Sequence, residues 1–339
     1  MKFLLSFILV VLAWGCSHHS SVDKHLNYSG NVMDVKELVT KIVIDTPLLS
    51  GMTTPYILGK YLILSDQQSK ENLVFVFDKK DFSYIAGAVH PGEGPDEITM
   101  LGELIPDEVH HRLFVADYGK MKIMSYSLDS ILLNPDCLPE SKIDMNNSII
   151  PTRLIYVNDT LCYACCMTVE SGKPFQESLV TWNMKTGDIH PLISGHPEIE
   201  RKRIRYTVSL EKDLIAVSYN HHDLLAIYDL KGNLKHYIYG SNWDNAISNA
   251  MIYYYKGIII CNDRIIVGYS GESNPNTGPI NVTHLLVYDL DGNYIKTLNV
   301  GYNMNAFCYD PEYNRIIMSL NDEKLQFAYL DLDGLLELE

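Results

Sequence analysis

The sequence has 339 residues, of which 47% are hydrophobic and 20% are charged, a composition typical of a globular protein with a sizeable core. A chain with a net charge of −15 gains nothing from releasing counterions on DNA or RNA, so nucleic acid is excluded as an expected partner. The 23 Tyr and nine Phe residues favour strands over helices.

The N-terminus carries the pattern of an export signal. An almost wholly apolar run from Phe3 to Trp14 is too short to span a bilayer, which needs about 20 residues, but it suits the apolar region of a signal peptide. It ends in Ala-Trp-Gly-Cys, and this resembles the bacterial lipobox. We therefore expect residues 1–15 to be a signal peptide and Cys16 to be lipidated. An ordinary secretory signal with a chance cysteine is the alternative.

Residues 16–35 begin with a run of Ser and His and are expected to form a lipidated polar tether. Residue 17 is Ser rather than Asp, which by analogy with Gram-negative sorting favours the outer membrane. We therefore expect a cell-envelope protein that is lipid-anchored to the outer membrane, facing the periplasm or the surface. The membrane is then one partner, reached through the anchor.

A strand pattern recurs after residue 50. An apolar strand ends in an aromatic–polar pair, a turn with Gly or Asp follows, and another strand begins. The gaps between the polar residues that close successive copies are 49, 56, 46, 60 and 42 residues. These closing residues are Asp78, Ser127, Asn183, Asp229, Asp289 and Asp331. A strand-rich period of this length predicts propeller blades of four strands each.

Each copy is preceded by two more strands, so every unit can be written A-B-C-D from the inside outwards. The sequence predicts an all-β domain over residues 36–339: a six-bladed β-propeller of four-stranded antiparallel blades. The predicted blades cover residues 52–89, 98–133, 150–194, 204–239, 250–300 and 305–339. Leu335–Glu339 has the pattern of the last D strand, and the strand-like Val39–Asp45 is expected to cap or extend the last blade and so join the two ends of the ring.

One loop carries a family resemblance. The segment His90–Glu97, which reads His-Pro-Gly-Glu-Gly-Pro-Asp-Glu, follows an apolar strand that ends in Phe-Asp. It resembles a TolB-like or NHL-like family of six-bladed propeller lipoproteins from Gram-negative envelopes. The resemblance implies fold and location but no activity. The loop itself has a structural interpretation: Gly92 and Gly94 permit unusual backbone angles, Pro95 stiffens the turn, and Glu97 can accept backbone hydrogen bonds. Ligand contact by the loop is the alternative.

The sequence indicates no catalytic residue, no metal site and no cofactor. The pair Cys162 and Cys165 could be redox-active or half a zinc site, but it lies inside a predicted strand, and small buried hydrophobic residues are the other interpretation. An envelope location leaves a disulfide open. No nucleophile elbow, Walker loop or His-Glu-x-x-His motif occurs.

A basic run and two aromatic residues are the candidate binding residues. Arg201, Arg203 and Arg205 fall in the connection between blades 3 and 4, in an otherwise acidic chain, and either form a solvated loop or an edge that binds an anion or a partner. Tyr254 falls on the A strand of blade 5, where Tyr suits either a ligand or blade packing. Trp243 is expected to border the same face.

In the A-B-C-D order, the B–C and D–A connections emerge on one face of the ring. The longest of them, Gly271–Thr283, is rich in Asn, Gly and Pro, so we expect this face to hold the largest pocket. The predicted function is a binding or protein-interaction module for an unknown protein, peptide or glycan. The alternative is a propeller-based lyase or hydrolase with its site at the channel mouth. Three or more converging His, Asp or Glu side chains there would favour the enzyme, and a mixed Tyr, Arg and Asn lining would favour binding.

Overall fold

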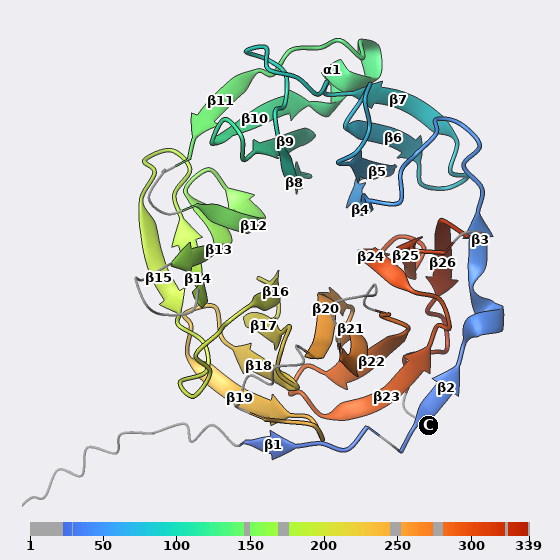
Figure 1. Ribbon diagram of the computed structural model, residues 1–339, viewed down its shortest axis with the longest axis vertical. Coiled ribbons are helices and arrows are strands. Elements are labelled where there is room, and N and C mark those ends of the chain that lie inside the picture. The colour runs from blue at the N-terminus through green and yellow to red at the C-terminus, as the bar shows by residue number, and fades with distance from the viewer. Residues whose placement is uncertain are drawn as a thin grey trace, which may run out of the picture.

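Six sheets stand around a common axis in the computed structural model of the chain (Figure 1). The structure describes residues 23–28, 30–145, 150–168, 176–244, 252–273, 281–322 and 325–337. The first strand of each sheet lies nearest the axis and later strands lie progressively further out. None of the helices within these ranges is long and apolar enough to cross a membrane.

Blades 1 to 3 follow the predicted A-B-C-D order. Blade 1 consists of β4 (Thr53–Leu58), β5 (Tyr61–Asp66), β6 (Val74–Asp78) and β7 (Tyr84–Ala88). Blade 2 consists of β8 (Leu101–Asp107), β9 (Arg112–Asp117), β10 (Lys122–Ser127) and β11 (Ser141–Asp144), with the short helix α1 (Leu128–Leu133) before its last strand. Blade 3 consists of β12 (Pro151–Asn158), β13 (Leu161–Thr168), β14 (Gln176–Trp182) and β15 (Ile189–Ile193).

Blades 4 to 6 complete the ring and include strands from the N-terminal segment. Blade 4 consists of β16 (Ile204–Ser209), β17 (Leu214–Tyr219), β18 (Leu224–Tyr228) and β19 (Leu234–Tyr239), with β1 (Lys24–His25) outside. Blade 5 consists of β20 (Ile252–Cys261), β21 (Arg264–Ser273), β22 (His284–Asp289) and β23 (Tyr294–Asn299), with β2 (Val32–Asp34) outside. Blade 6 consists of β24 (Met304–Asp310), β25 (Arg315–Leu320), β26 (Phe327–Asp331) and β3 (Thr40–Ile42).

The sheets stack because their central strands are apolar on both faces. Every residue of β17 is buried, and so is every residue of β18. A strand buried on both sides needs a covering layer on each face, and the neighbouring blades provide it. The cores therefore lie between blades: Ile63 and Val76 of blade 1 share a cluster with Leu113 of blade 2. The prediction of six four-stranded antiparallel blades is confirmed.

The ring closes through the N-terminal strand β3. It pairs antiparallel with β26, with Ile42 opposite Phe327, and supplies the outermost strand of blade 6. The expected role of Val39–Asp45 in joining the two ends is thus confirmed. The assignment of Leu335–Glu339 as the last D strand is wrong, because β3 already pairs with β26 there and Leu335 lies in a turn after Gly334, whose φ is +72°. Residues 338 and 339 lie outside the described ranges.

The expected polar tether is packed on the ring wherever it is described. β1 pairs in parallel with β19, and Lys24 donates hydrogen bonds from Nζ to the Asp291 carbonyl and the Asn293 side chain. β2 pairs in parallel with β23. A short 3₁₀ turn, η1 (Lys36–Leu38), then leads to β3. The N-terminal segment therefore follows the outer rim of blades 4, 5 and 6 (Figure 1). Residues 1–22, with the signal segment and Cys16, lie outside the described ranges.

Candidate functional site

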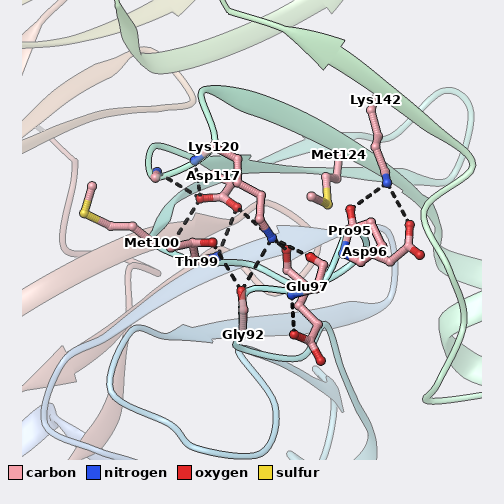
Figure 2. Close-up of polar contacts among 12 residues, drawn as sticks. Gly92, Pro95, Asp96, Glu97, Thr99, Met100, Asp117, Lys120, Met124 and Lys142 are labelled. Carbon is pink, nitrogen blue, oxygen red and sulfur yellow. Dashed lines mark hydrogen bonds and ion pairs between the residues drawn. The ribbon is translucent and has the colours of Figure 1, made fainter.

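The face with the B–C and D–A connections, called the upper face below, is held together by carboxylates at the ends of B strands. Asp117 ends β9, and its carboxylate accepts backbone hydrogen bonds from Thr99 and Met100, both at 3.0 Å, on the connection that arrives from blade 1 (Figure 2). Asp66 does the same at the end of β5, where it accepts the Ser50 backbone N–H at 2.7 Å. Each carboxylate thereby fixes the start of an A strand.

The Gly92–Glu97 loop belongs to this framework (Figure 2). The Glu97 carboxylate turns back into its own loop and accepts the Gly94 N–H at 2.7 Å. Lys120, on the B–C connection of blade 2, donates from Nζ to the carbonyls of Gly94 and Glu97, both at 2.6 Å. Lys142 reaches the Pro95 carbonyl at 2.6 Å. The polar groups of the loop are used within the protein, which agrees with its structural interpretation.

Replacing Gly92 with alanine is expected to destabilise this loop. A Cβ atom there would lie 2.0 Å from Oε2 of Glu97, so the carboxylate would have to leave and its hydrogen bond to the Gly94 N–H would be lost. We expect a loss of about 1–3 kcal/mol in the free energy of unfolding, measured with urea. Gly51→Ala is the control, because nothing lies within 4 Å of a Cβ atom at that position. Equal stability of the two variants would contradict the prediction.

The structure divides the basic run between a connection and a strand. Arg201 and Arg203 are half-buried on the upper face. Burial of His221 lowers the pKa of that histidine, and the nearby charges of Arg201 and Arg203 lower it further. Lys202 between them is buried and donates to the Ser194 carbonyl at 2.8 Å. Arg205 lies in β16 itself, on an A strand next to the axis. The interpretation of the basic run as a solvated loop therefore does not apply to Arg205.

Trp243 lies on the same face as the basic run, in a cluster of rings. Its indole meets the rings of Tyr239 at 4.8 Å, His196 at 5.3 Å and His222 at 6.0 Å. His222 donates from Nδ1 to the carbonyl of Asp244, the residue after Trp243, at 3.0 Å. Burial lowers the pKa of both His196 and His222 and keeps them neutral at pH 7.

Tyr254 is a packing residue. It is 6% exposed, and its N–H donates to the Asn220 carbonyl at 2.8 Å, which joins blade 5 to blade 4. Tyr254 and its neighbour Tyr255 are both buried and belong to the same apolar cluster. Register shifts on either side of Tyr255 break the alternation of β20 with β21. The ligand interpretation of Tyr254 therefore loses its geometric basis.

The sequence interpretation missed a layer of polar side chains on the A strands. One residue from each A strand lies four or five positions before the strand ends, at a similar height along the axis. All six remain partly exposed although they lie on the innermost strands. This set, called the inner layer, consists of Thr54, Glu103, Arg153, Arg205, Lys256 and Asn305. Their spacings along the chain are 49, 50, 52, 51 and 49 residues, a period that could have revealed them.

Contacts of the inner layer join blade 2 to blade 3, blade 5 to blade 6, and blade 6 to blade 1. Glu103 accepts the Leu154 N–H of blade 3 at 3.1 Å. Lys256 donates from Nζ to Oδ1 of Asn305 in blade 6 at 3.0 Å. Asn305 in turn reaches the Thr53 carbonyl of blade 1 at 3.4 Å. The layer thus carries more positive than negative charge, with three cationic side chains and one carboxylate.

The cysteines are buried packing residues. Cys162 and Cys166 belong to one apolar cluster and Cys165 to another, as strand alternation predicts, and all three are free thiols at most 2% exposed. Burial raises the pKa of Cys162 and Cys165 to about 12 and that of Cys166 to about 11. Within the described residues, no three His, Cys, Asp or Glu side chains are grouped to hold a metal ion.

These thiols are expected to resist alkylation in the folded protein. Iodoacetamide attacks the thiolate, and burial of Cys162, Cys165 and Cys166 suppresses both the thiolate and access to it. Mass spectrometry after treatment at pH 8 should find these three unmodified and the half-buried Cys137 labelled first. In urea all of them should react. Rapid labelling of Cys162 or Cys165 in the native protein would revive the redox interpretation.

A recess of about 440 Å³ lies on the opposite, lower face. The A–B turns of blades 5 and 6 and the chain after β26 form it, with Asp263, Asn314 and Asp333 among its lining residues. The upper-face pocket expected beside Gly271–Thr283 is not tested, because residues 274–280 lie outside the described ranges.

Comparisons with known proteins agree with this architecture. A family model described as 6-bladed beta-propeller matches residues 40–249. No curated protein matches the sequence. A member of the DUF4221 family from Bacteroides vulgatus has a similar structure, with a TM-score of 0.55 at 11% identity over 86% of this chain and 95% of that one. A candidate exported protein from Bacteroides fragilis gives 0.57 at 12% identity over 91% and 98%.

A luciferin-regenerating enzyme is similar as well, with a TM-score of 0.53 at 11% identity over 86% of this chain and 93% of that one. At such identities the likeness shows the fold alone, and one fold can carry unrelated functions. The function has to be argued from the residues of the upper face and the inner layer.

Proposed function

We propose that this chain, which belongs to that six-bladed beta-propeller family, is a lipid-anchored envelope protein whose upper face and inner layer bind a ligand or partner. The kinship with TolB-like or NHL-like envelope lipoproteins is part of the proposal. The observation that carries it is the mixed composition of the inner layer on the innermost strands, in which Arg, Lys, Asn and Thr accompany one carboxylate, Glu103. Such a composition suits recognition through hydrogen bonds and charge.

The charge distribution supports the same function. The whole chain carries −15, yet Arg201 and Arg203 lie on the upper face and Arg205 and Lys256 lie on neighbouring A strands below it. A local positive field in an acidic protein attracts anionic groups and guides them to one place. Within the described ranges, no grouping of three metal-ligating side chains favours the lyase or hydrolase alternative.

Binding is tested by capture from the native envelope. The acylated protein would be cross-linked in cells, purified, and its partners identified by mass spectrometry. The double variant Arg201→Glu and Arg203→Glu is expected to lose the captured species. The control is Lys185→Glu with Lys231→Glu, an equal change of charge at exposed positions away from the upper face. Equal capture by both variants would refute binding through the upper face.

The anchor is tested separately. The Cys16→Ser variant is expected to leave the membrane fraction and appear in the soluble periplasmic fraction, because an acyl chain contributes about 0.8 kcal/mol for each buried CH₂ group. Western blots of fractionated cells measure this, with an unrelated periplasmic protein as the fractionation control. A variant that stays with the membrane as the wild type does would remove the lipid anchor from the proposal.

A further inference from the structure

The inner layer coincides with a set of β-bulges. The ladder between the A and B strands slips by one residue at Glu103 in β8, at Arg153 in β12, at Lys256 in β20 and at Asn305 in β24. A bulge leaves its extra residue outside the ladder and turns the local backbone, and bulges gather beside functional sites. In four of the six A strands, regular pairing with the B strand is therefore interrupted at the position of the inner-layer residue.

Backbone angles and glycine packing at the bulges also depart from those of a regular strand. Arg153 has a φ of +53°, in the left-handed region that side chains other than glycine rarely adopt. Two of the bulges contain glycine: a Cβ atom at Gly102 would lie 2.5 Å from the Tyr118 ring, and one at Gly257 would lie 2.8 Å from Phe307. The bulges are thus packed into place by their neighbours, and strain of this kind collects at functional sites.

The junction of blades 4 and 5 differs from its neighbours in charge. The Arg153 guanidinium has a carboxylate partner, Glu177, at 3.0 Å, and Glu177 also accepts the Ile204 N–H at 2.8 Å. In the described part of the chain, Arg205 has no carboxylate at ion-pair distance; its hydrogen bond goes to the Ile204 carbonyl at 3.4 Å. Lys256 likewise has only the neutral amide of Asn305.

Two cations therefore stand on adjacent A strands, and among the described residues neither has a carboxylate at ion-pair distance. The charge of Glu177 acts on Arg205 only from further away. Burial lowers the pKa of Arg205 to about 10, and burial followed by the charge of Arg205 lowers the pKa of Lys256. Arg205 remains protonated at pH 7 in spite of its burial. Both side chains also keep partial exposure, so a small molecule at the axis could reach them.

We propose that Arg205 and Lys256 form an oxyanion site, which receives the carboxylate or phosphate group of a small ligand on the inner wall of blades 4 and 5. The guanidinium offers paired donors that match either anion, and the ammonium adds a point charge beside it. Arg201 and Arg203 lie on the upper face at the entrance to the same strand and would guide the anion inwards. This inference rests on the proposed binding function and names the chemistry of its ligand.

Calorimetry and thermal unfolding test the site directly. The full mature chain in Tris chloride would be titrated at pH 7.5 with inorganic phosphate and, in a second arm, with succinate. One of these oxyanions is expected to bind and, at about 100 times its Kd, to raise Tm by about 5 °C over sodium chloride of equal ionic strength. The arm that responds identifies the anion as phosphate or carboxylate. No gain over chloride in either arm would overturn the proposal.

Variants locate the binding. Arg205→Met and Lys256→Met are each expected to raise Kd about 10- to 100-fold, the loss of one charged hydrogen-bond partner. Lys256→Arg keeps the positive charge and should retain binding. It provides the test of the site if a methionine variant does not fold. The matched control is Lys212→Met: this lysine lies at the junction of the same two blades on the lower face and pairs with Asp263 at 2.8 Å. An equal loss in the control would overturn the assignment.

The pH profile gives a second readout. In the succinate arm, where the ligand keeps a constant charge above pH 7, binding should decline as the solution becomes alkaline, because burial lowers the pKa of Lys256 and favours loss of its proton. The Lys256→Arg variant should hold its affinity to a higher pH than the wild type. If the Met variants keep anion affinity while Arg201→Glu with Arg203→Glu still abolishes envelope capture, the oxyanion site fails and the binding function stands.

Discussion

Replacing Asp310 with alanine is expected to lower the free energy of unfolding by about 3–5 kcal/mol. Asp310 ends the A strand of blade 6 and is fully buried. Its carboxylate pairs with Nζ of Lys79 from blade 1 at 2.9 Å and with Nε of Arg315 at 3.1 Å. Arg315 also donates to the Lys79 carbonyl. Without the carboxylate, two cations remain buried at the junction between the first and last blades.

Glu312→Ala is the matched control for this experiment. Glu312 pairs with the same Lys79 at 3.0 Å, but its side chain is 60% exposed, so its loss should cost under about 1 kcal/mol. Urea unfolding followed by circular dichroism measures both variants. If Asp310→Ala costs no more than Glu312→Ala, the buried network does not stabilise the closure of the ring.

The second large effect is expected at Ile42, which closes the ring from the other end of the chain. Ile42 lies on β3, is 3% exposed, and shares an apolar cluster with Leu49, Phe75 and Phe327. Ile42→Ala should cost about 2–5 kcal/mol, since it removes buried methyl groups and leaves a cavity beside the last blade.

Lys41→Ala separates this packing effect from the strand itself. Lys41 is exposed on the same strand, opposite Ala328 in the ladder, so its side chain can be removed without opening the core. We expect less than about 0.5 kcal/mol for that change, again by urea unfolding. Equal losses at the two positions would mean that β3 does not pack as described.

The B and C strands could be predicted because each repeats an apolar run that ends in a turn signal. The first two strands, β1 and β2, could not, since they have two and three residues and pair in parallel with distant strands. Leu335 misled the prediction for a related reason. The Asp-Gly turn before it has the signature of a hairpin, and nothing local shows that β3 already pairs with β26.

The candidate site was predictable only in part. The basic run pointed to the start of blade 4, but in the proposed site Arg205 works with Lys256, which is 51 residues away on blade 5. The faces of Cys162, Cys165 and Cys166 follow from regular alternation, because β13 pairs with β14 without a shift. Around Tyr254 such alternation does not hold, because the register of β20 against β21 shifts there.

The attachment of β1 to blade 4 has a consequence for where a partner can be met. Lys24 is the eighth residue after Cys16, and a fully extended chain over eight residue steps reaches about 28 Å. If Cys16 carries the lipid, this short segment keeps the rim of blade 4 close to the membrane surface. The junction of blades 4 and 5 then also lies near that surface. A partner would then have to sit in that membrane or come to its surface, and a small ligand would be collected there.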